Sequence, residues 1–146
     1  MNAPRRVITG IDANGRSCIQ IDGSSGMTIW STDDSPADNT GSKDAGSNTM
    51  SFPTRGTCFI FHDFLPRSSV PMHATDSVDY IVVLSGEVSF ITETGEVHLR
   101  PGDALVDRGI MHGWRNDGDA PCRIMNALSP AHPVGKGATI SGTVNV

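Results

Sequence analysis

The sequence predicts an all-β chain, and three observations carry that prediction. Sixteen glycines and nine prolines occur among the 146 residues, and Val, Ile and Thr recur in short runs broken by Gly, Asn, Asp and Pro, a pattern typical of strands joined by tight turns. No window sustains a helical apolar period over three turns. From residue 56 onward the apolar runs follow one another at intervals of about ten residues, as in sandwiches and barrels. The length suits one folding unit with a sizeable core, so we expect a single domain.

The first third of the chain predicts a hairpin, a third strand and a long loop. Residues 5–11 and 17–22 are apolar runs that flank an Asn-Gly turn, which is a strong hairpin signal. Met27–Ser31 is expected to form the third strand. Residues 32–54 are polar, glycine-rich and without period, too long for an ordinary connection. They are predicted to form either a lid over a binding site or an arm.

The strands of the core are predicted within residues 56–130. Residues 56–64 are apolar on both faces, as expected of a central strand between two packed layers. Further strands are expected in the apolar runs that follow, separated by turns at 65–69, 85–86, 94–95, 101–103 and 117–118. The tail, residues 131–146, is small and polar, and it is predicted to be an edge strand or a loose end.

Charge and cysteine content narrow the classes of partner. The formal net charge is −5 and no Lys/Arg cluster is present, which argues against nucleic acid and favours a small molecule. Cys18, Cys58 and Cys122 lie in apolar segments without C-x-x-C spacing, so they are expected to be free thiols of a reducing compartment. No signal peptide or membrane-length apolar run is visible, so we expect a cytoplasmic protein with no membrane partner.

Residues 70–85 form the first stretch suited to chemistry. His73, Thr75 and Asp79 stand at odd-numbered positions just ahead of an apolar run. Side chains of one parity share a face of a β-strand, so an imidazole and a carboxylate are expected to point the same way. Tyr80, of opposite parity, is expected on the outside.

Residues 101–116 form the second such stretch, in which His112 and Trp114 share a parity. If this face meets the one that carries His73 and Asp79, two imidazoles and one carboxylate converge inside a barrel. This is the composition of a two-histidine, one-carboxylate metal site, which leaves coordination positions open for substrate, water or dioxygen.

The two stretches resemble the two motifs of the cupin superfamily. Counting back from Gly86, Asp79 stands at the glutamate position of the first motif, His73 at its first histidine, and Thr75 in place of its second histidine. Asp107 replaces the proline of the second motif, whose other positions are matched by Gly102, Gly109, His112 and Asn116. The segments MHATDSVDY, VLSGEV, LRPGD and HGWRN are similar to those of small single-domain cupins of bacteria and fungi, and the likeness covers nearly the whole chain.

The resemblance implies a fold, a metal and an oligomer. The implied fold is a double-stranded β-helix, the cupin jelly-roll barrel, within a single domain over 1–146: N-terminal strands and loop over 1–55, the barrel over 56–130 and the tail over 131–146. A divalent Fe, Ni, Mn or Zn ion on His73, Asp79 and His112 is implied, weakly bound or absent because Thr75 is a poor ligand. A homodimer is also implied, with the N-terminal strands as candidates for exchange.

Two classes of function stay open. The first is a cupin-type enzyme in which the three metal ligands are the catalytic residues. It would act on a small carbonyl- or carboxylate-bearing or aromatic metabolite by lyase, decarboxylase, isomerase or dioxygenase chemistry. The second is a metal-free cupin, either a small-ligand binding module or an enzyme in which Asp79 orients a histidine that acts as general base. Substrate contacts are predicted for Trp114, Thr75 and His62, with core packing as the alternative for Trp114 and a hydrogen-bonded core position as the alternative for His62.

Overall fold

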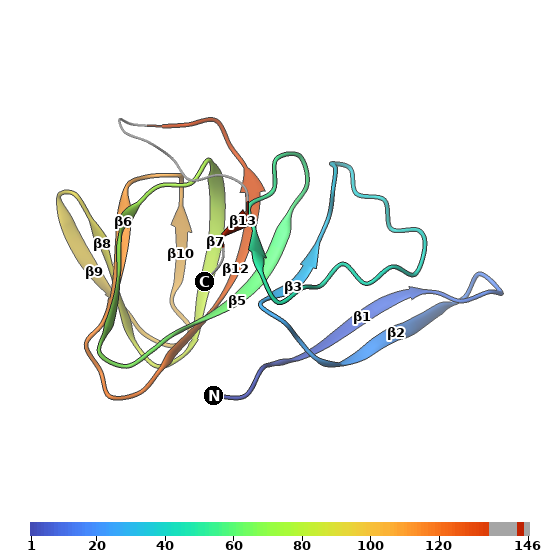
Figure 1. The fold of residues 1–146 in the computed structure, drawn as a ribbon, viewed down its shortest axis with the longest axis horizontal. Helices are drawn as coiled ribbons and strands as arrows, with labels where there is room; N and C mark the ends of the chain where they lie inside the picture. Colours follow the sequence, from blue (N-terminus) through green and yellow to red (C-terminus); the bar gives the residue numbers. More distant parts are fainter. Residues whose placement is uncertain (135–142, 145–146) are drawn as a thin grey trace.

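The structure is a computed structural model that describes residues 1–134 and 143–144 (Figure 1). These residues form strands and no helix, as the sequence predicts, so no described helix is long and apolar enough to cross a membrane. The three cysteines form no disulfide. The strands are β1 (Arg5–Ile11), β2 (Ser17–Ser24), β3 (Thr28–Ser31), β4 (Met50–Ser51), β5 (Cys58–Phe64), β6 (Ser68–His73), β7 (Ser77–Ser85), β8 (Val88–Thr92), β9 (Gly95–Leu99), β10 (Ala104–Asp107), β11 (His112–Asn116), β12 (Cys122–Pro130) and β13 (Thr143–Val144).

Two antiparallel sheets form the barrel (Figure 1). The larger sheet has the strand order β10-β7-β12-β5-β3, and the smaller has the order β6-β11-β8-β9. From β5 to β12 the chain passes repeatedly from one sheet to the other, and only β8 and β9 follow each other within a sheet. This winding is that of a double-stranded β-helix, as predicted.

The N-terminal hairpin, β1 with β2, forms as predicted and lies apart from the two sheets in Figure 1. Its turn ends at Gly15, whose φ of 75° is easily reached only by glycine. The base of the hairpin is held by Arg6, which pairs with Asp44 and donates a hydrogen bond to the carbonyl of Ile29. The hairpin is therefore fixed to the loop and to β3 at one end only.

The 32–54 loop and the tail meet in a small sheet that the sequence did not predict. β4 lies near the end of the loop and pairs with β13, which belongs to the tail. The edge-strand prediction for the tail is thus met at Thr143–Val144. The rest of that prediction, at 135–142 and 145–146, lies outside the described residues.

The core consists of two clusters, and along the strands that form it buried side chains alternate with more exposed ones. In β7, Asp79 and Ile81 are buried, whereas Tyr80 is 55% exposed, as its parity predicts. The larger cluster fills the space between the sheets and consists of Phe64, Ile81, Val83, Val88, Phe90, Leu99, Trp114, Cys122 and Ile124. The smaller cluster consists of Cys58, Ile60 and Leu128, with Met50 and Phe52 packed against it.

Candidate functional site

A cavity of about 400 Å³ lies in the barrel, and its walls come mainly from the inward faces of both sheets. Most of its lining is apolar: Met50, Phe52, Ile60, Phe64, Val70, Pro71, Met72, Ile81, Trp114 and Ile124. The polar lining consists of His62, His73, Thr75, Asp79, His112 and Asn126. All six site residues predicted from the sequence therefore line one cavity, although they come from different strands and from the turn between β6 and β7.

The prediction that the residues of the first motif share one face of a strand was wrong. His73 ends β6 in the smaller sheet, whereas Asp79 lies in β7 in the larger sheet, and Thr75 lies in the turn between them. The three residues do not share the face of one strand. They reach the same cavity because the chain crosses from one sheet to the other between them.

The two histidines are neighbours on the smaller sheet. His112 begins β11 and lies opposite His73 in register, with ring centroids 4.4 Å apart. His73 Nδ1 lies 2.8 Å from the carbonyl oxygen of Pro71, and His112 Nδ1 lies 2.8 Å from that of Ile110. A carbonyl only accepts hydrogen bonds, so each Nδ1 carries the proton. Each ring is left with Nε2 as the nitrogen that can accept a proton or bind a ligand.

Asp79 faces these histidines from the larger sheet. Its Oδ1 accepts a 2.6 Å hydrogen bond from Ser77 Oγ, and its Oδ2 accepts a 3.1 Å hydrogen bond from Asn126 Nδ2. The hydroxyl of Thr75 lies 2.8 Å from Ser77 Oγ and extends the network. Burial raises the pKa of Asp79, against the two hydrogen bonds, which lower it. The buried carboxyl group therefore binds a proton more readily than an exposed aspartate does.

Asn126 is a site residue that sequence reasoning missed. It lies in β12, is 5% exposed, and lines the cavity. Its Nδ2 donates to Asp79, while its Oδ1 is buried and accepts no hydrogen bond from the part of the chain that the structure describes. Its signal in the sequence is a lone amide that shares the parity of the apolar Ile124 and Leu128. A ligand O–H or N–H group is the natural partner for this oxygen.

Asp107 is the second residue that was missed as part of the site. It ends β10 and lies opposite Asp79 in register. Its Oδ2 lies 3.0 Å from Nδ1 of His112. Burial lowers the pKa of His112, and the Ile110 carbonyl and the Asp107 carboxylate oppose that shift. The sequence does contain a signal for Asp107, since an aspartate two residues before Gly109 has the spacing of an Asx turn.

Trp114 and His62 line the cavity and also pack against core side chains, while the substrate contacts predicted for them stay a prediction. The Trp114 ring lies 4.9 Å from both Phe64 and Phe90, so it packs in the larger core cluster while its remaining surface lines the cavity. His62 lies edge-on to Phe64 at 4.6 Å, and burial lowers its pKa. Both residues are therefore wall residues that contribute to packing.

The three predicted metal ligands do not form a metal site in this arrangement. Among residues 1–134 and 143–144, no three His, Cys, Asp or Glu side chains are grouped closely enough to hold an ion. The two imidazoles of His73 and His112 fit a metal, because Nδ1 of each is already bonded and Nε2 is not. Asp79 does not complete the set in this arrangement, because it is not grouped closely enough with the two imidazoles; the hydrogen bonds from Ser77 and Asn126 would themselves leave its oxygens a lone pair each.

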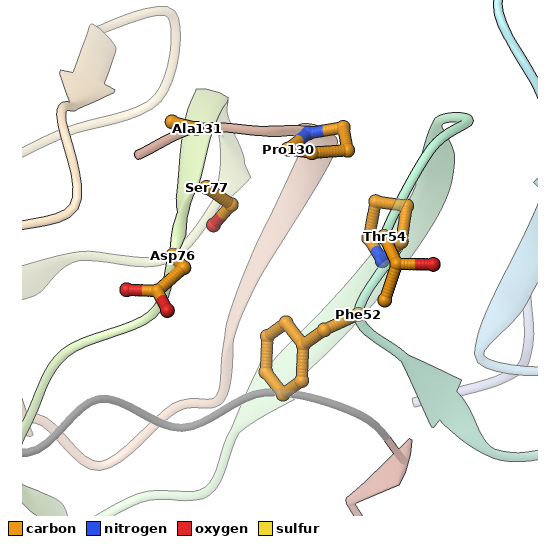
Figure 2. A pocket seen from close by; sticks show the side chains of 7 residues that line it. Phe52, Thr54, Asp76, Ser77, Pro130 and Ala131 are labelled. Carbon is orange, nitrogen blue, oxygen red and sulfur yellow. The ribbon is translucent and has the colours of Figure 1, made fainter. Parts of the chain in front are cut away.

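A smaller hollow of about 190 Å³ lies beside this cavity (Figure 2). Figure 2 shows Asp76 and Ser77 on one side of it and Thr54 on the other. Phe52 lines both the hollow and the main cavity. The end of the 32–54 loop therefore forms part of the cavity wall, as a lid would.

Comparison with known proteins relates the chain to cupins. The sequence model of the family described as "Cupin domain" matches residues 60–128. The cupin-domain-containing oxidoreductase srdB of Neurospora crassa is 31% identical, covering 90% of this chain and 76% of that protein. Phomopsin biosynthesis cluster protein D of Diaporthe leptostromiformis is 33% identical, covering 80% and 72%. A solved Klebsiella pneumoniae protein with a double-stranded β-helix domain is 23% identical, with a TM-score of 0.47, covering 51% of this chain and 68% of that one.

Proposed function

This chain belongs to the cupin superfamily, and we propose that it is an enzyme that acts on a small metabolite bound in the barrel cavity. The observation that carries the proposal is the convergence of His73, His112 and Asp79 on one cavity whose other walls are mainly apolar. Titratable groups that meet in an apolar cavity are the usual composition of an active site.

The lining favours an uncharged substrate with an apolar body and one or two oxygen atoms. The volume of about 400 Å³ lies in the range of small-molecule sites. No Lys or Arg occurs among the described residues that line the cavity, so a substrate carboxylate would lack a cationic partner there. The buried Oδ1 of Asn126 suits a hydroxyl donor, and Trp114 suits a flat ring. A carbonyl- or hydroxyl-bearing aromatic metabolite fits these walls better than a carboxylic acid does.

The proposed chemistry is proton transfer between the two walls of the cavity. His112 Nε2, which carries no proton when the ring is neutral, accepts a proton from the substrate. Asp79 lies on the facing sheet, and its raised pKa suits it to give a proton to, or share one with, a substrate oxygen. Removal of a proton next to a carbonyl and its return elsewhere is isomerisation, and loss of a leaving group in its place is a lyase reaction.

Oxidation or reduction is the second candidate, and the name of one relative favours it, since srdB is called a cupin-domain-containing oxidoreductase. Such a reaction needs a redox partner, and a bound divalent metal is the one that the cupin resemblance implies. His73 and His112 are the residues of the cavity that suit such an ion, whereas Asp79 does not complete the ligand set.

Proton exchange tests the first candidate directly. The protein is incubated in D₂O and EDTA with a panel of aromatic ketones and aldehydes that carry exchangeable α-protons, and deuterium uptake is followed by NMR. His112→Gln and Asp79→Asn are expected to lower the rate by about 100-fold or more. His98→Gln is the control, since His98 lies outside the cavity lining and binds Glu87; it should leave the rate unchanged.

The other outcomes assign the other functions. Turnover that changes the oxidation state of a substrate, is lost in EDTA and is restored by one divalent metal, with stoichiometric metal lost in both His73→Ala and His112→Ala, would replace the first candidate with the second. Tight uptake of an unchanged ligand, with no exchange and no turnover, would make the protein a binding module and overturn the enzyme proposal.

A further inference from the structure

Asp107 is a buried carboxylate that neither cupin motif assigns and that the proposed chemistry does not use. Its residue is 2% exposed. Its Oδ1 accepts hydrogen bonds from the backbone N–H groups of Gly109 (3.1 Å) and Ile110 (3.2 Å), which fixes the connection between β10 and β11. Its Oδ2 is buried and accepts no hydrogen bond from the described residues, but it lies 3.0 Å from His112 Nδ1, which is hydrogen-bonded to the carbonyl of Ile110.

Two acceptor oxygens therefore converge on one nitrogen of His112. The carbonyl of Ile110 lies 2.8 Å from Nδ1, and the carboxylate of Asp107 lies 3.0 Å from it. If the proton were on Nε2, the lone pair of Nδ1 would face both oxygens without a hydrogen between them, which is strongly unfavourable in a buried site. The same carboxylate accepts a hydrogen bond from the backbone N–H of Ile110. It therefore also positions the residue whose carbonyl is the other acceptor at His112 Nδ1.

His73 provides a contrast within the same cavity. Its Nδ1 has a backbone carbonyl as acceptor, that of Pro71, and no carboxylate lies beside it. It is also only half-buried, whereas His112 is 4% exposed. The two rings thus differ in their burial and in the carboxylate that Asp107 places beside His112.

We propose that Asp107 is a positioning residue that locks His112 in the tautomer with the proton on Nδ1, so that Nε2 is the atom offered to the ligand. The importance of this lock for catalysis rests on the proposed function of His112, but the tautomer itself can be measured without any substrate. An aspartate at this position thereby takes over a role that the usual proline cannot fill, because proline has no side-chain acceptor.

Long-range ¹H–¹⁵N NMR of the imidazole rings tests the lock in the whole protein, in EDTA at a pH of about 8, above the ordinary histidine pKa. We expect the wild type to show His112 with Nδ1 protonated. Asp107→Asn keeps the size of the side chain but replaces one acceptor oxygen by an N–H donor. It should shift the tautomer ratio of His112 toward the Nε2-protonated form by about tenfold, since a negative charge beside Nδ1 is removed and an N–H donor can face that nitrogen instead.

His73 and Asp103 provide the controls. A variant that merely loosens the fold would change the signals of both rings, whereas loss of positioning changes His112 and leaves His73 as it was. Asp103→Asn removes another aspartate that accepts a backbone hydrogen bond in a turn, from Arg100, and it should leave both rings unchanged.

Two results would overturn the proposal. One is a wild-type His112 with the proton on Nε2, which decides the matter even if Asp107→Asn does not fold. The other is a folded Asp107→Asn protein in which the His112 ratio is unchanged. A locked His112 in a protein that exchanges no substrate proton would instead leave this inference standing and remove the proposed function.

Discussion

Replacing Asp79 by asparagine should make the protein more stable, and increasingly so as the pH rises. Asp79 is 7% exposed as a whole residue, and burial is the largest cause of the raised pKa of its carboxyl group. The neighbouring carboxylate of Asp107 adds to the shift, while the hydrogen bonds from Ser77 and Asn126 oppose it. Asp79→Asn keeps the shape of the side chain and removes the buried charge, but it also replaces one oxygen that accepts a hydrogen bond by an N–H donor. The change of the stability difference with pH therefore measures the electrostatic cost of ionising this group.

The direction follows from proton binding in the two states. Below the unfolded pKa of about 3.8, Asp79 is protonated whether the chain is folded or not, and it contributes no pH dependence. Between the unfolded pKa and the raised folded pKa, the folded protein holds the proton and the unfolded chain has released it. The wild type then loses stability by up to about 1.4 kcal/mol per pH unit relative to Asp79→Asn. Above the folded pKa the difference stays constant.

Urea unfolding at a series of pH values from about 3.5 to 8, in EDTA, measures this difference. Ser77→Ala removes a hydrogen bond that lowers the pKa of Asp79. It should therefore extend to higher pH the range over which the stability of the protein falls as the pH rises. In the double variant with Asp79→Asn the effect of Ser77→Ala on the slope should vanish. A stability difference that is flat, or that shrinks as the pH rises, would refute the reasoning and indicate that the folded state favours the carboxylate.

Three further predictions test the core, the loop and the oligomer. Leu128→Ala should lower the free energy of unfolding in urea by about 2–5 kcal/mol, because Leu128 is fully buried; Leu84→Ala, at an outer position that is 47% exposed, should change it by less than about 1 kcal/mol. Phe52→Ala should weaken fluorescence-detected binding of the neutral aromatic probe 1-aminoanthracene by about tenfold, and an unchanged affinity would mean that the loop does not wall the cavity. Aspartates at both Val7 and Ile19, hairpin side chains that are 45% and 60% exposed, should convert the expected homodimer to a monomer in light scattering; a monomeric wild type would contradict the dimer prediction.

The strands were predictable because each is marked by local chemistry. Apolar runs bounded by Gly, Pro, Asn and Asp indicated the hairpin and the barrel strands, with differences of a few residues at most of their ends. Alternation within one strand was equally informative, since Tyr80 lies outside while Asp79 lies inside. The pairing of β4 with β13 was not predictable, because it joins two short polar segments nearly a hundred residues apart whose contact depends on the tertiary fold.

The candidate site was predictable as a set of residues but not as an arrangement. Parity correctly grouped His73 and Thr75 with Asp79, but it wrongly placed all three on one strand. Period-two alternation cannot indicate where a chain leaves one sheet for the other. Asn126 and Asp107 were missed for a related reason: each acquires its role from a partner on another strand, Asp79 for one and His112 for the other. The motif positions identify the side chains that face the ligand, such as Asp79 and His112. The side chains in contact with these, such as Asn126 and Asp107, influence where their protons are bound. Asn126 and Ser77 orient the carboxylate of Asp79 by one hydrogen bond to each oxygen, and Asp107 fixes the proton of His112 on the side away from the ligand. The chemistry of this cavity therefore depends on the residues behind the predicted site residues, one of them a departure from the second motif, at least as much as on the predicted site residues themselves.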